Sequence, residues 1–110
     1  LLLVAPGAEQ RVARNVLLSN DGDVATTLSA PILTGRGGAS LGALAARLRV
    51  LTPEGASGSI ASGASRLARV EFIGTCAGTG ALQTIEAELR WAAPNSLSIL
   101  PIQAQTRCPP

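Results

Sequence analysis

The alternation of apolar and polar residues is the strongest local pattern in this chain. In residues 84–91, TIEAELRW, every second residue is apolar, and residues 66–73, RLARVEFI, repeat the pattern. Because successive side chains of a strand point to opposite faces, each segment presents one apolar row and one polar row. Both segments are therefore predicted to be half-buried antiparallel strands.

Turn-forming residues divide the other strand-like segments. The NDGD sequence at residues 20–23 lies between the apolar positions of residues 10–19 and the β-branched residues of 24–33, which predicts a hairpin. The AAPNS sequence at residues 92–96 predicts a second hairpin, between the strand ending at Trp91 and the segment LSILPIQAQT.

The strand pattern is interrupted at four places. Proline cannot donate to a strand ladder, so Pro31 and Pro101 predict an edge, a bulge or a break in their strands. The leucine spacing in residues 40–48 predicts one short helical turn that leads into a strand. Residues 52–65 are rich in Gly, Ser and Ala, which predicts a flexible loop holding at most one short strand.

Together these segments give about seven or eight short strands separated by turns, the pattern of an antiparallel β-sandwich. The length of 110 residues predicts one domain covering residues 1–110. The stretch LLLVAP at residues 1–6 is apolar on both faces, which predicts an ordered first strand that completes its own sheet or a neighbour's. Leu1, Leu2, Leu3 and Val4 are therefore candidate interface residues.

The composition limits the core and the origin of the chain. Hydrophobic residues make up 46% of it, yet Phe72 and Trp91 are its only aromatic residues, so the core must be aliphatic. All nine basic residues are arginine. This bias indicates a GC-rich bacterial genome rather than a particular function. The absence of an initial Met predicts a processed product or a fragment. The longest apolar run, Leu1 to Ala5, is far shorter than the roughly 20 residues that span a bilayer.

The two cysteines, Cys76 and Cys108, lie near a turn and near the chain end. In an oxidising compartment they would form a disulfide, whereas in a reducing one they would be two small apolar side chains. Their spacing fits neither a zinc site nor a redox site. The disulfide is the favoured reading, and it implies a periplasmic, secreted or particle-surface location.

The order of the motifs resembles that of bacterial immunoglobulin-like domains of the ASH and HYDIN type. The matching segments are QRVARNVLLSNDGDVATTLSA, IASGASRLARVEFIGTC and LQTIEAELRWAAPNSLSILPIQAQ, whereas residues 35–51 have no counterpart. The resemblance implies an immunoglobulin-like β-sandwich that binds or spaces other components without catalysis. It implies no active-site residues.

Candidate catalytic residues are few. The chain has no His and no Lys, which removes the commonest general base and the Ser-Lys pair. Glu86 and Glu88 fall on one face of their strand, about 7 Å apart by strand geometry. Thr84 and Arg90 continue the same row, so a solvated outer face is favoured over a catalytic pair.

Two loops resemble ligand-binding motifs. NDGD at residues 20–23 offers oxygen atoms but lacks the other acids and the final Glu of a calcium loop, which favours a plain turn. TGRGGAS at residues 34–40 lacks the Lys of a phosphate-binding loop, which favours a flexible loop. No metal, cofactor or catalytic residue is predicted.

Two functions follow from these expectations. The favoured one is a non-catalytic structural or protein-interaction module, a subunit or accessory domain of an extracytoplasmic or particle-surface assembly. The alternative is a domain that binds an anionic partner, either nucleic acid or an anionic polymer, through the arginines of neighbouring strands. Its candidate residues are Arg47, Arg49, Arg66 and Arg69. Nucleic acid is not favoured, because acids are interspersed and stacking aromatics are lacking.

Overall fold

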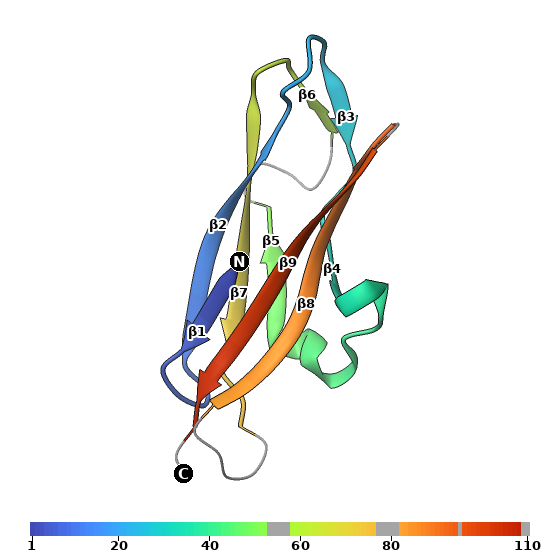
Figure 1. Cartoon of the computed structure of the whole chain (residues 1–110). Coiled ribbons are helices and arrows are strands. Elements are labelled where there is room, and N and C mark those ends of the chain that lie inside the picture. Colours follow the sequence, from blue (N-terminus) through green and yellow to red (C-terminus); the bar gives the residue numbers. More distant parts are fainter. Residues whose placement is uncertain (53–57, 77–81, 95, 109–110) are drawn as a thin grey trace.

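The computed structural model describes residues 1–52, 58–76, 82–94 and 96–108 (Figure 1). Within them the chain forms nine strands and two short 3-10 helices, which confirms the all-β prediction. In chain order these are β1 (Leu2–Ala5), β2 (Arg11–Ser19), β3 (Thr26–Leu28), β4 (Ile32–Gly35), η1 (Arg36–Gly38), η2 (Gly42–Ala46), β5 (Leu48–Leu51), β6 (Gly58–Ile60), β7 (Ser65–Ile73), β8 (Leu82–Ala93) and β9 (Ser96–Arg107).

The strands form two main sheets that pack as a sandwich. Sheet A has the order β1-β9-β8-β4, and sheet B has the order β2-β7-β5. In Figure 1 the long β8 and β9 strands run diagonally in front of β5 and β7 of sheet B. A third pair, β3 with β6, extends one end of the molecule. The predicted β-sandwich is confirmed.

The first strand departs from the antiparallel expectation. β1 runs parallel to β9, with Leu2 opposite Gln103 and Ala5 opposite Thr106. Parallel neighbours need a long crossover connection. Here the strands are the first and the last in the described chain, so the rest of the sandwich serves as that connection.

The core lies between the two sheets and follows the alternation seen in the sequence. Its largest member, Phe72, is fully buried between residues of both sheets. The inward rows of β7 and β8 are those predicted, and the cluster comprises Leu3, Ala5, Leu48, Val70, Phe72, Ala87, Leu89, Ile102 and Ala104. A smaller cluster of Leu18, Leu28, Ile60 and Ala68 lies beneath the β3–β6 pair. Aliphatic side chains thus supply nearly the whole interior.

The NDGD turn does not form the predicted hairpin, and that prediction was wrong. β2 pairs with β7, while β3 pairs with β6, so the turn connects strands of different sheets. Asn20 is 7% exposed, and its side-chain amide donates to the carbonyl oxygens of Val24 and Ile60, both at 2.9 Å. Its Oδ1 accepts from the Gly22 amide at 3.0 Å. These bonds direct the chain away from β2 toward the β3–β6 pair.

The second hairpin is confirmed: β8 and β9 are antiparallel neighbours in an unbroken register. Pro101 lies at a strand edge, which is one of the outcomes that the sequence predicted. The Leu1 backbone nitrogen donates to the Pro101 oxygen at 2.9 Å, which shows that Pro101 turns its backbone toward the β1 side. β1 pairs with β9 only from Gln103 onward. The position where Pro101 lacks an N–H is therefore on a stretch of the β9 edge that no described strand pairs with.

The remaining interruptions also match the sequence. Pro31 lies between the end of β3 and the start of β4. The predicted helical turn is η2, which leads into β5. Within residues 52–65 the structure places the short strand β6. Residues 53–57 of the expected flexible loop lie outside the described residues.

Candidate interaction surfaces

The two carboxylates considered for catalysis lie on the outer face of sheet A, each beside an arginine. Arg36 contacts Glu86 at 2.5 Å, and Arg90 contacts Glu88 at 2.8 Å. The hydrogen bond from Arg90, followed by one from the Gly37 amide, holds the pKa of Glu88 below its ordinary value of 4.5. A general acid at neutral pH needs a raised pKa, so Glu88 is suited to an ion pair.

The glycine-rich loop at residues 34–40 is closed by the same carboxylate. The Gly37 amide, which a phosphate-binding loop would offer to its ligand, donates to Oε1 of Glu88 at 3.1 Å. The loop contains η1 and is tied to β8 by the Arg36–Glu86 contact. Its geometry therefore anchors the loop to sheet A.

The NDGD turn has the geometry of a structural turn. The Asn20 side chain makes three hydrogen bonds within the protein, while Asp21 and Asp23 are exposed. Among the residues that the structure describes, no three His, Cys, Asp or Glu side chains gather where they could hold a metal ion.

The apolar first strand completes the chain's own sheet. Leu3 is fully buried in the core and is therefore inaccessible, whereas Leu1 and Leu2 are 37% and 48% exposed. Val4 is half-buried. Of the candidate interface residues, only Leu1 and Leu2 offer substantial apolar surface.

A more accessible apolar surface lies beside them, along the open edge of β9. Residues 97–101 have β8 on one side and, among the described residues, no strand on the other. Leu97 and Ile99 are 57% and 45% exposed. We call Leu2, Leu97, Ile99 and Pro101 the sheet A edge surface.

A groove of about 500 Å³ continues this surface toward β1. The walls include Leu2 and Pro101, and the polar part includes Arg36, Glu86 and Glu88. The edge surface thus combines unpaired strand backbone, exposed aliphatic side chains and a few fixed charges.

Sheet B brings together only some of the arginines proposed from the sequence. Arg49 of β5 and Arg69 of β7 both approach Glu71 on the outer face, at 2.8 and 3.6 Å. Arg47 lies just before β5 and pairs with Glu9 at 2.5 Å. Arg66 lies apart from them.

Arg66 is opposite the buried Leu18 in the β2–β7 register, so it is on the inner side of sheet B. Its guanidinium donates to the Ser59 oxygen at 3.4 Å. The sequence also missed Arg11, which lies on the outer face and whose charge acts on Glu71. Only the pairing of β2 with β7 reveals that neighbour.

Glu71 is 8% exposed at the centre of these arginines. The hydrogen bond from Arg49 lowers its pKa below the ordinary 4.5, burial opposes this shift, and the charges of Arg49, Arg11 and Arg69 lower it further. The carboxylate is therefore ionised at neutral pH.

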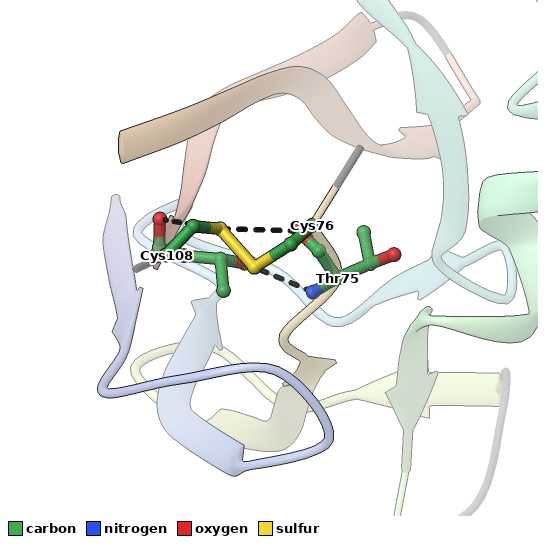
Figure 2. Close-up of a disulfide and its surroundings, with 4 residues drawn as sticks. Thr75, Cys76 and Cys108 are labelled. Atoms are coloured by element: carbon green, nitrogen blue, oxygen red, sulfur yellow. Dashed lines mark hydrogen bonds between the residues drawn. A yellow bond between two sulfur atoms is a disulfide. The ribbon is translucent and has the colours of Figure 1, made fainter. Parts of the chain in front are cut away.

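Cys76 and Cys108 form a disulfide, with an S–S distance of 2.06 Å (Figure 2). It joins the segment after β7 to the end of β9, and so connects sheet B to sheet A. Beside it, the Thr75 amide donates to the hydroxyl of the buried Thr106 at 3.1 Å. The described helices include none long and apolar enough to cross a membrane.

Comparisons with known proteins give structural matches alone. No sequence-family model matches the chain, and no curated protein matches it. The ASH/PapD-like domain 7 of human CEP192 superposes with a TM-score of 0.56 at 14% identity, over 98% of this chain and 79% of that one.

Two further matches have the same architecture. The Pseudomonas aeruginosa CupB2 chaperone gives a TM-score of 0.58 at 14% identity over 93% of this chain, which corresponds to 50% of the chaperone. The MSP-domain protein-like SSP-19 of Caenorhabditis elegans gives 0.54 at 13% identity, over 94% of this chain and 92% of that one. The chain therefore has the immunoglobulin-like fold shared by ASH/PapD-like, MSP and pilus-chaperone domains.

Proposed function

We propose that this chain is a non-catalytic protein-interaction module, a single immunoglobulin-like domain that serves as a subunit or accessory domain of an extracytoplasmic or particle-surface assembly. The observation that carries the proposal is the edge of β9 at residues 97–101, which no strand among the described residues covers. A strand edge with unpaired backbone groups is a template for another strand. The disulfide supports an oxidising compartment.

Of the devices that usually prevent strand addition, the open edge has a proline, Pro101, at its end nearest β1 but no charged side chain. Residues 96–106 contain no charged side chain, whereas charges on an edge strand oppose pairing with another chain. Leu97 and Ile99 project from the same outer face and give an incoming strand apolar contacts. Backbone hydrogen bonds would supply affinity, and these side chains would supply specificity.

The alternation of backbone groups provides a sharp test. Ile99 and Gln103 turn their N–H and C=O groups toward the β1 side, and Pro101 turns its C=O the same way. The bonds from the Gln103 amide to the Leu1 oxygen and from the Leu1 nitrogen to the Pro101 oxygen show this orientation. Ile99→Pro would therefore remove a donor from the open edge and leave the β8 ladder intact. Ile99→Val keeps the donor and is the matched control.

The experiment isolates the native complex of the full chain and identifies its partner by mass spectrometry. We expect the wild type and Ile99→Val to retain the same partner and Ile99→Pro to lose it, with far-ultraviolet circular dichroism unchanged. Retention of the partner by a folded Ile99→Pro variant would refute strand addition at this edge.

A further inference from the structure

The outer face of sheet B carries a positive cluster that the β9 edge does not involve. Arg11, Arg49 and Arg69 surround Glu71, and we call these four residues the sheet B arginine cluster. Glu71 is opposite Ala13 of β2 and Arg49 of β5 in the register. Arg11 and Arg69 are each two residues along from this row, so all four side chains belong to the same face.

The positive charge of the three arginines exceeds the negative charge of the carboxylate that they surround. Three guanidinium groups share one carboxylate, which leaves two positive charges in excess. Arg49 and Arg69 have side chains 53% and 48% exposed, and Arg11 is also exposed, so their remaining donors are accessible to a partner. A guanidinium presents five donors in a planar fork that matches a carboxylate.

Exposed leucines border the cluster. Leu51 is 38% exposed and lies opposite Arg69 in the β5–β7 register. Leu17, which is 64% exposed, lies on the same outward row of β2 as Arg11. A ligand that complements this face therefore carries negative charges and apolar groups in alternation.

We propose that the outer face of sheet B binds an acidic polypeptide segment of a partner, with carboxylates on Arg11 and Arg69 and an apolar side chain against Leu17 or Leu51. A nucleic acid fits the face less well, because unpaired bases need aromatic platforms. The only two aromatic residues of the chain lie elsewhere: Phe72 is in the core, and Trp91 is on β8 of the other sheet. The two surfaces lie on opposite sides of the sandwich, so this proposal is independent of the β9 edge.

The test measures binding of a fluorescent peptide of alternating Glu and Leu by the full chain. We expect Arg11→Gln and Arg69→Gln each to weaken binding about 3- to 10-fold, and added salt to weaken it further, as is usual for exposed charges. Arg107→Gln removes the same charge from the end of β9 on sheet A and is the matched control. An equal loss with Arg107→Gln would show a net-charge effect and would overturn the proposal.

A gain of binding separates the proposal from damage to the fold. Glu71→Gln removes the acid that competes for Arg49 and Arg69, so we expect it to tighten peptide binding several-fold. Unchanged or weaker binding by a folded Glu71→Gln variant would contradict the assignment. Tighter binding of single-stranded DNA or of anionic phospholipid vesicles than of the peptide, with the same dependence on Arg11, would overturn the choice of polypeptide.

Discussion

The outer faces of the two sheets differ in how their charged and apolar side chains are arranged. On sheet A, Arg36 and Arg90 are matched by Glu86 and Glu88, and the apolar residues lie at an open strand edge. On sheet B, three arginines share Glu71. The first face is electrically balanced and offers backbone hydrogen bonds, whereas the second offers charge. One small sandwich therefore presents two chemically distinct outer faces.

The edges of the two sheets show the same contrast. β2, an edge strand of sheet B, carries Arg11 and Arg14, and Arg14 occupies an inward position opposite the buried Val70. A charge at an inward position of an edge strand discourages the addition of another chain. The open part of β9 has no such charge. Strand addition is thus expected at the β9 edge of sheet A and opposed at the β2 edge of sheet B.

The largest effect is expected from cutting the covalent link between the two sheets. The disulfide closes a loop with a sequence separation of 32. We expect the double variant Cys76→Ser, Cys108→Ser to lower the free energy of unfolding by about 3.5 to 4 kcal/mol in the chain-entropy estimate. Urea titration of the variant and of the oxidised wild type measures the difference. If reduction left the wild type equally stable, the link between the faces would be energetically unimportant.

A smaller effect on stability is expected when the same substitution, leucine to arginine, is made on each of the two faces. Leu97→Arg adds a charge to the β9 edge, and Leu17→Arg adds one to β2 beside the arginine cluster. Both side chains are more than half exposed, so each change should alter stability by less than about 0.5 kcal/mol.

Binding should respond differently. We expect Leu97→Arg to reduce recovery of the native partner about tenfold or more, because a charge on an edge opposes strand addition. Leu17→Arg should leave that recovery unchanged. Equal losses, measured by quantitative mass spectrometry of the isolated complexes, would show that the partner does not distinguish sheet A from sheet B.

The sequence predicted those features that can be read along a single strand. The alternation in β7 and β8 identifies Val70, Phe72, Ala87 and Leu89 as inward residues, and the structure buries all four. Pro101 marks the open edge because its ring removes a donor from the ladder. Local pattern therefore sufficed for strand identity, for the β8–β9 hairpin and for the class of fold.

The sequence could not predict pairing between distant strands. The NDGD turn reads as a hairpin, but β2 pairs with β7, about 50 residues away along the chain. That register places Arg11 beside Glu71 and Arg66 on the inner side, so the arginine cluster differs from the one expected. The burial of Asn20 was also hidden, because a turn residue is ordinarily exposed.

The smallest expected effect compares the central carboxylates of the two faces at low pH. The pKa values of Glu71 and Glu88 are both lowered in the folded protein from 4.5. A lowered pKa adds stability above the unfolded value, and this stability is lost as pH falls below about 4.5 through the folded value. Glu71→Gln and Glu88→Gln should therefore each flatten the acid limb of the stability curve, measured by thermal unfolding between pH 3 and 7.

Salt should separate the two variants. Glu71→Gln leaves Arg11, Arg49 and Arg69 facing one another without an acid, whereas Glu88→Gln leaves the Arg36–Glu86 pair on its face. At neutral pH and low ionic strength the first variant should thus be the less stable of the two. Added salt screens repulsion among exposed charges and should narrow the gap. A gap that is absent, or that salt leaves unchanged, would mean that the arginines of sheet B do not repel one another, and the contrast in charge between the faces would lose its energetic basis.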